Sequence, residues 1–217
     1  MSIKTGIAIF ALGSLSTCSF ASLINASFEQ PSLPQNTIGS SGITGWDING
    51  SGGTGVWNIA GSSLWPLSAP NGVQIGYTYA NFLAQQSTDV ITVGLNTISA
   101  YGGRRSDGFA SSFTMEFWAG GTESAGSITG GTILGTANYT APAAPMGSFT
   151  FLSASYTAGV GDPNLGQLIS VRFVNGGGAH ISLDDVRITT QPVPEPASMA
   201  ALGIGALALL RRKKKSA

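Results

Sequence analysis

Three carboxylates have the residue type and the placement for cation binding. Glu29 ends the first predicted strand, and Asp184 and Asp185 are adjacent in the last one. Carboxylate oxygens are hard ligands that suit Ca²⁺, with backbone carbonyls completing the shell. Adjacent aspartates in an otherwise apolar strand are costly unless they are paired or metal-bound. The sequence therefore leaves two interpretations, a structural calcium at Glu29, Asp184 and Asp185 or carboxylates that cap loops and face solvent.

Three tryptophans offer flat rings that can stack on the apolar face of a sugar. Trp57 and Trp65 flank a glycine-rich loop at residues 61–63, and Trp118 shares a strand face with the polar Glu116. Most tryptophans in a β-sandwich serve its core instead. We keep Trp57, Trp65, Trp118 and Glu116 as candidate glycan-binding residues, and core packing as the more frequent role of each tryptophan.

The sequence contains only weak candidates for a catalytic site. A Ser-His-Asp triad needs His180, the only histidine, which stands beside three glycines where a turn histidine is the commoner interpretation. A glycosidase needs two carboxylates that face one cleft, and nothing in the spacing of the glutamates pairs them. Residues 50–55 fit the dinucleotide pattern G-x-G-x-x-G, but no helix follows them. The sequence predicts a protein without enzymatic activity, and a hydrolase is the least favoured alternative.

The composition bounds the elements that must position these residues. Of 217 residues only 9% are charged, 31 are glycine and 42% are hydrophobic. Many short strands joined by glycine-rich turns satisfy these values together. All lysines lie near the two ends of the chain, which leaves an acidic middle. Nucleic acid is therefore not an expected partner, because phosphate backbones require clustered Lys and Arg.

The N-terminal segment reads as an export signal. Lys4 precedes an apolar run over residues 6–15, and Ser19-Phe20-Ala21 supplies small residues before a cleavage site. We expect a signal peptide at residues 1–21, with lipoprotein processing at Cys18 as a less favoured alternative. Because Cys18 is the only cysteine, the mature chain has no disulfide and no thiolate chemistry.

The C-terminal segment reads as a membrane anchor. Residues 191–196 form a proline-rich linker, residues 197–210 are apolar and uncharged, and residues 211–217 carry a basic cluster. An apolar helix suits lipid, and the basic cluster should stay in the cytoplasm. The run is shorter than the usual ~18 residues, which snorkelling or local bilayer thinning can offset.

This order of Pro-Glu-Pro, short hydrophobic helix and basic tail resembles the PEP-CTERM protein-sorting signal. The matching residues are Pro194, Glu195 and Pro196, with Arg211 and Arg212 after the helix. The resemblance implies recognition by exosortase, a sorting enzyme of Gram-negative bacteria that produce exopolysaccharide. It also implies that the tail is removed, so that the helix is a transient anchor.

Residues 22–190 read as one all-β domain. Phe113, Met115 and Phe117 alternate with polar residues, as do Val73, Ile75 and Tyr77. Further predicted strands are 23–28, 55–59, 91–101, 132–139, 148–156, 167–174 and 179–188. Short strands at regular spacing predict a two-sheet antiparallel sandwich, flanked by the signal-peptide helix and the anchor helix.

Several segments in order resemble the galactose-binding-like jelly roll of carbohydrate-binding modules. They are residues 25–29, Gly45-Trp46, 71–74, 82–85 and 182–188. The resemblance implies that the first and last strands lie side by side with a calcium where they meet, and that Trp46 belongs to the core. The leading hypothesis is an exported cell-envelope protein that is sorted through its tail and binds exopolysaccharide. The alternative is a structural or self-associating surface protein without a sugar site.

Overall fold

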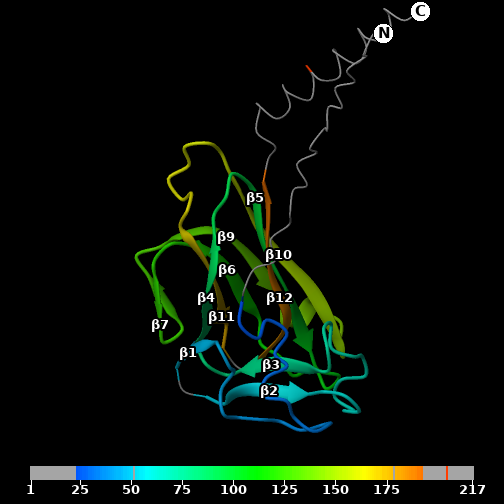
Figure 1. Ribbon diagram of the computed structural model, residues 1–217. Coiled ribbons are helices and arrows are strands. Elements are labelled where there is room, and N and C mark those ends of the chain that lie inside the picture. Colours follow the sequence, from blue (N-terminus) through cyan, green and yellow to red (C-terminus); the bar gives the residue numbers. More distant parts are fainter. Residues whose placement is uncertain (1–22, 51, 178, 193–203, 205–217) are drawn as a thin grey trace, which may run out of the picture. The chain divides into compact units, whose positions relative to one another are not determined.

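The computed structural model describes residues 23–50, 52–177, 179–192 and 204 (Figure 1). Contacts divide the chain into one unit of residues 19–193 and another that comprises residues 1–18 and 194–217. The predicted signal peptide, the sorting residues 194–196, 211 and 212, and all of the predicted anchor except Ile204 lie outside the described residues. Within the described part, no helix has the length and apolar character to cross a bilayer.

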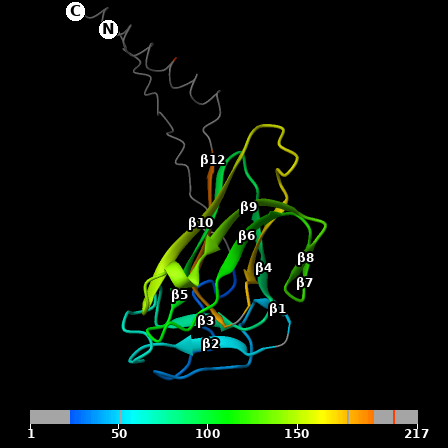
Figure 2. The same ribbon diagram turned by 180° about the vertical axis from the view of Figure 1, so that it is seen from behind.

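Two five-stranded antiparallel sheets make up the domain, as Figures 1 and 2 show from opposite sides. The first sheet has the order β1 (Asp47–Asn49), β4 (Phe82–Val90), β11 (Leu168–Asn175), β6 (Phe113–Ala119) and β9 (Thr132–Tyr139). The second has the order β10 (Ser148–Ala158), β5 (Gly94–Arg104), β12 (Ile181–Pro192), β3 (Gln74–Thr78) and β2 (Thr54–Asn58). A hairpin of β7 (Thr122–Ser124) and β8 (Ser127–Thr129) and the 3-10 helix η1 (Ala141–Ala143) complete it. The predicted all-β jelly-roll sandwich is confirmed.

The core lies between the two sheets and is built from alternate strand residues. Met115 and Phe117 of β6 and Phe173 of β11 have no exposed surface. Phe28 stacks on Trp46 with ring centroids 5.4 Å apart, which confirms Trp46 as a core residue. Deleting such a side chain typically costs 3–5 kcal/mol, so this core is the main source of stability.

The predicted strands differ from the structure in one false strand and four omitted ones. Residues 23–28 form a turn instead of a strand, because Asn25 and Phe28 have φ angles of 53° and 57°. The Phe28 amide donates to the Asn25 carbonyl at 3.0 Å, so Glu29 follows a turn. The omitted strands are β1, β4, β7 and β8. β1, β7 and β8 are only three residues long, and the second half of β4 is polar and interrupts the apolar alternation.

The last strand divides the outer face of the second sheet into two regions. Ile181 and Leu183 of β12 belong to the intersheet core, so Ser182 and Asp184 point outward by alternation. The register shifts between Asp184 and Arg187, where Asp185 has a φ of 50°. Side chains from residues 57–77 and 104–109 surround the beginning of the strand, whereas the stretch after the bulge pairs with β5, which pairs in turn with β10.

Candidate functional site

An aromatic cluster lies where β12 begins, on the outer face of the second sheet. We call it the His180 cluster. Its members are Trp57, Trp65, Tyr77, Tyr79, Arg105, Phe109, His180 and Ser182. They come from β2, from β3 and the residue after it, from β12 and the turn before it, and from the segments that connect β2 to β3 and β5 to β6. The sheet therefore brings together residues more than 100 positions apart.

The imidazole of His180 is the centre of this cluster. Its ring centroid lies 5.3 Å from that of Tyr79 and 5.2 Å from that of Phe109. Tyr79 and Phe109 are 43% and 40% exposed, whereas His180 is 2% exposed. Two partly exposed aromatic rings thus contact a buried imidazole. That arrangement suits stacking against a flat or ring-shaped molecule.

Buried polar atoms without a hydrogen-bond partner concentrate in the same place. The described part of the chain has eight such side-chain atoms, and six belong to this cluster. They are Trp57 Nε1, Trp65 Nε1, Arg105 Nε, both ring nitrogens of His180, and Ser182 Oγ. Because an unsatisfied buried polar group costs roughly 1–3 kcal/mol, six in one cluster are a large cost for a fold to retain.

Burial also sets the charge state of the histidine. Burial, followed by the neighbouring Arg105 guanidinium, lowers the pKa of His180 to about 4. The imidazole is therefore neutral at physiological pH, with one nitrogen as donor and the other as acceptor. Arg105 forms an ion pair with Asp107, and its guanidinium carbon lies 5.7 Å from the Trp57 ring centroid.

Hydrogen bonds fix the segments that carry these side chains. Ser111 Oγ accepts from the Ala179 amide at 2.8 Å, and the Ser111 amide donates to the His180 carbonyl at 3.0 Å. The Ser106 amide donates to the Leu64 carbonyl at 2.9 Å. The turn before β12 is thus tied to the segment at residues 105–112, and that segment is tied to the one at residues 59–73, which holds the His180 ring near the rings of Tyr79 and Phe109.

Sequence reasoning identified only part of this cluster. Trp57 and Trp65 are members, but they are 5% and 3% exposed and form no open stacking surface. Core packing, which we considered the more frequent role, is what the structure shows for both. Tyr79, Arg105 and Phe109 were missed, and the one available signal was the pair Tyr77 and Tyr79 on one face of a predicted strand.

The other two predicted glycan residues form a polar cluster on the first sheet. Glu116 Oε2 accepts from Arg172 Nε at 2.7 Å and from Trp118 Nε1 at 2.9 Å. The Arg172 guanidinium carbon lies 4.8 Å from the Trp118 ring centroid and 4.9 Å from that of Phe82. Trp118 is 9% exposed, so Glu116 and Trp118 are engaged with Arg172 and present no free platform.

The three predicted calcium ligands converge on residues 71–74. Glu29 Oε1 accepts from the Val73 and Gln74 amides at 2.9 and 2.8 Å. Asp184 Oδ2 accepts from the Asn71 amide at 2.8 Å, and Asp185 Oδ1 accepts from Asn71 Nδ2 at 3.0 Å. Glu29 follows the first turn and the aspartates lie in β12, so the beginning and the end of the domain meet here through a turn and not through the expected first strand.

Asp184 is the unusual member of this acidic group. It has no exposed surface, and burial, with the nearby charges of Asp185 and Glu29, raises its pKa to about 8 against the hydrogen bonds that it accepts. Across residues 23–50, 52–177 and 179–192, no three His, Cys, Asp or Glu side chains form a metal-binding group by themselves. A cation here would therefore need backbone carbonyls as well, which Ca²⁺ accepts.

The fold and these clusters define a jelly-roll domain with an aromatic cluster on one sheet. Residues 21–189 match the family model described as HpiC1-like, HpiC1 cyclase, so the chain belongs to the HpiC1-like family. Residues 192–215 match the PEP-CTERM protein-sorting motif, which confirms the resemblance seen in the tail and implies processing by exosortase. No curated protein matches the sequence.

Solved structures support the fold. The Stig cyclase Fisc from Fischerella sp. TAU, in complex with an indole compound, is 19% identical with a TM-score of 0.68. A cyclase from Fischerella sp. TAU in complex with 4-(1H-indol-3-yl)butan-2-one is 20% identical with a TM-score of 0.66. In both cases the similarity covers 82% of this chain and 100% of the other. These identities show a shared fold.

A xylan-binding domain has weaker structural similarity to this chain. The CBM22-1 xylan-binding domain of Paenibacillus barcinonensis Xyn10C is 15% identical with a TM-score of 0.45, over 75% of this chain and 99% of that one. The family model that matches this chain is named for an enzyme. The absence of enzymatic activity stays a prediction.

Proposed function

We propose that this chain is an exported cell-surface protein that is held in the membrane by its C-terminal segment until exosortase releases it. The match of residues 192–215 to the sorting motif carries this proposal. β12 ends at Pro192, so the folded domain runs directly into the motif. A cut near Pro194-Glu195-Pro196 would free the domain without disturbing either sheet.

Intact mass of the protein from the native envelope tests the sorting step. We expect a species that starts at Ser22 and ends near the Pro-Glu-Pro motif in cells with exosortase. Cells without the enzyme should retain the basic tail through Ala217. A mass that includes Arg211 to Ala217 in both strains would show that the anchor is permanent and that exosortase does not process this chain.

We further propose that the domain binds a small ring-shaped ligand at the His180 cluster. The observation that carries this is the concentration of six unpartnered polar atoms among aromatic rings. The membership in the HpiC1-like family supports it, since Fischerella cyclases bind indole compounds. We propose binding without turnover, because Asp107 is paired with Arg105 and Asp184 accepts from backbone amides.

Replacing His180 by Phe should strengthen the fold and weaken ligand binding. Phe keeps the ring contacts and removes two unpartnered nitrogens, so stability should rise by about 1–3 kcal/mol. The wild type should lose stability as pH falls from 6.5 towards 4, because its buried imidazole opposes protonation. The variant should not show this loss, because it has no imidazole. Calorimetric titration with 4-(1H-indol-3-yl)butan-2-one should show about tenfold weaker binding.

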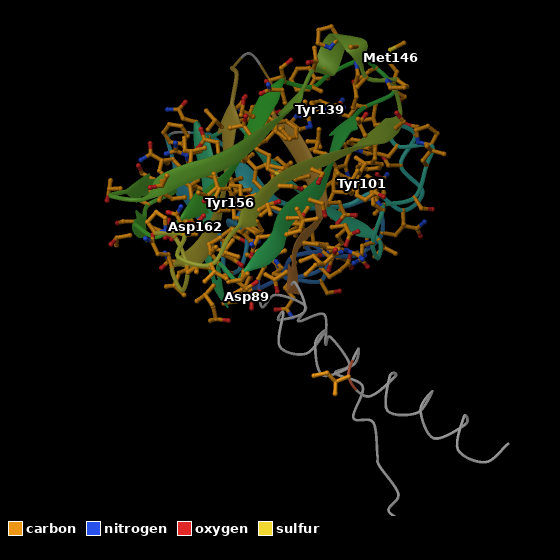
Figure 3. All side chains as sticks on the ribbon, turned by 90° about the horizontal axis from the view of Figure 1, so that it is seen from above. Asp89, Tyr101, Tyr139, Met146, Tyr156 and Asp162 are labelled. Carbon is orange, nitrogen blue, oxygen red and sulfur yellow. The ribbon has the colours of Figure 1, made fainter. Side chains whose placement is uncertain are left out.

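Tyr139→Phe is the matched control for this experiment. The Tyr139 hydroxyl is also buried and unpartnered, but it belongs to the intersheet core at the end of β9 (Figure 3). This variant should also gain stability, yet it should bind the indole ketone as the wild type does. Equal binding by the His180 variant and the wild type would contradict the proposed site, and product formation would contradict binding without turnover.

We propose that Glu29, Asp184 and Asp185 hold a structural Ca²⁺ with carbonyls from the neighbouring backbone. The carboxylates approach the 71–74 segment from two ends of the chain, and hard oxygen donors suit this ion. A divalent cation would also offset the cost of ionising the buried Asp184. The tests of this proposal are part of the stability predictions in the Discussion.

Exopolysaccharide is the second candidate ligand. The sorting motif supports a place on the cell surface, and Phe151 is a large aromatic side chain that is 56% exposed on the second sheet. Trp57, Trp65 and Trp118 are buried, so a polysaccharide would have to use other aromatic residues than those the sequence suggested.

A further inference from the structure

The outer face of β5, β10 and β12 continues beyond the His180 cluster as an uncovered surface, which we call the open face. Its members are Thr97, Ser99 and Tyr101 of β5, Phe151, Ser153 and Ser155 of β10, and Arg187 and Thr189 of β12. The intervening residues Ile98, Ala100, Leu152 and Ala154 belong to the intersheet core. By alternation, the members of the open face therefore point away from the core.

The register aligns these side chains in three rows across the strands. Phe151, Tyr101 and Asp184 form the first row, in which Asp184 has no exposed surface. Ser153, Ser99 and Arg187 form the second row, and Ser155, Thr97 and Thr189 form the third. With rows about 7 Å apart and strands about 4.8 Å apart, the face is an elongated strip about 14 Å long.

One end of the strip is aromatic. The ring centroids of Phe151 and Tyr101 are 5.3 Å apart at an interplanar angle of 64°. Phe151 is 56% exposed, so most of its ring is available to a ligand, and Figure 3 labels its neighbour Tyr101 on β5. An exposed aromatic ring among hydroxyl groups is the combination that stacks on the apolar face of a sugar while its hydroxyls are hydrogen-bonded.

The rest of the strip is polar and carries little charge. Thr97 Oγ1 and Ser155 Oγ are 3.0 Å apart, so they share a hydrogen bond and a common side of the sheet. Arg187 is the one charged member, and its Nε donates to Asp185 Oδ1 at 2.8 Å. Its side chain is 55% exposed, whereas that of Asp185 is 10% exposed. The two neighbouring carboxylates are covered, because Asp185 is paired with Arg187 and Asp184 has no exposed surface. The exposed part of the strip therefore offers hydroxyls and guanidinium donors to an oxygen-rich ligand.

We propose that the open face binds a polysaccharide chain along the strands, with a sugar ring on Phe151 and Tyr101 and the following rings over the hydroxyl rows. This inference rests on the exopolysaccharide binding proposed above and assigns the residues that perform it. A second copy of this chain is the competing occupant, because β10 is an edge strand of its sheet. The hydroxyl rows favour the polysaccharide, since protein interfaces depend more on apolar contact at their centre.

Affinity electrophoresis in gels that contain exopolysaccharide from the native cells tests the proposal. The exported domain should be retarded, and Phe151→Ser should bind about tenfold more weakly because a stacking ring is lost. Ile133→Ser is the matched control, since Ile133 is 45% exposed on β9 of the other sheet and should not affect retardation. Both substitutions are at exposed positions, so circular dichroism and melting temperature should stay near those of the wild type.

The possible results distinguish a failure of exopolysaccharide binding from a failure of the open-face assignment. If the wild type is not retarded, exopolysaccharide binding itself is wrong. If the wild type and Phe151→Ser are retarded equally, the polysaccharide binds elsewhere and the assignment of the open face is wrong. If sedimentation shows a dimer that Phe151→Ser dissociates and the polymer has no effect, the occupant is a second copy of the chain.

Discussion

Replacing Asp184 by Asn should flatten the dependence of stability on pH between about 4 and 8 when calcium is chelated. The folded-state pKa of Asp184 is raised to about 8 from an ordinary value of 3.8, so the folded protein holds a proton that the unfolded chain releases. The contribution of Asp184 to the stability of the wild type is therefore largest below pH 3.8 and is lost as pH rises towards 8. Each pKa unit corresponds to about 1.4 kcal/mol, so the loss amounts to several kcal/mol.

Urea unfolding across this pH range in a calcium chelator measures the effect. Asn has no proton to release, so the variant should be more stable than the wild type at pH 9 and should lose that advantage at pH 4. Glu123→Gln is the matched control. Burial, and then the neighbouring Asp47, raises the pKa of Glu123 from 4.5 to about 7, so this variant should change the slope of the profile between those values and leave the fall between pH 7 and 8 in place.

Calcium should act on the same carboxylate. At a concentration 100 times its dissociation constant, an ion that binds only the folded state adds about 2.7 kcal/mol. The gain should increase as pH rises towards 8, because Ca²⁺ and the proton compete for Asp184. Asp184→Asn should lose this gain and Glu123→Gln should keep it. A wild type with flat stability in the chelator would contradict the raised pKa, and a calcium gain in the Asn variant would place the ion elsewhere.

The fold was predictable because strand alternation is a local property. Met115 and Phe117 on one side of β6 and Glu116 on the other follow from period two alone, and β9 has the predicted bounds. The turn at residues 25–28 was not predictable, since its apolar pattern is that of a strand and only the left-handed φ angles of Asn25 and Phe28 distinguish it. Local alternation cannot report such backbone angles.

The candidate site was less accessible from the sequence. Trp57 and Trp65 stood out by residue type, but their burial depends on Phe149 and Arg105, which reach them from other parts of the chain. Phe109 and His180 are 71 positions apart and meet because Ser111 binds the turn before β12. The carboxylates were easier to identify, because buried charge in an apolar strand is a cost that the sequence itself displays.

Replacing Arg172 by Met should destabilise the domain by about 2–4 kcal/mol, because it leaves the Glu116 carboxylate without its partner. The two side chains are 14% and 12% exposed, so water replaces the lost contact only in part. Glu116→Gln should cost less, since its amide oxygen can still accept from Trp118 Nε1. The double variant should cost clearly less than the sum of the two, and urea unfolding of all four proteins gives the coupling energy.

The ion pair of Arg105 and Asp107 is the comparison, because Asp107 is 42% exposed and such surface pairs contribute about 0–1 kcal/mol. Asp107→Asn should therefore have a small effect on unfolding. A large coupling between Glu116 and Arg172, with unchanged retardation by exopolysaccharide in both single variants, would show that this cluster holds β6 to β11. If the coupling energy is as small as that of the surface pair and the single variants are retarded less by exopolysaccharide, Glu116 and Trp118 bind the ligand instead. In that case the polysaccharide would lie on the first sheet and the open face of the second would lose its assigned role.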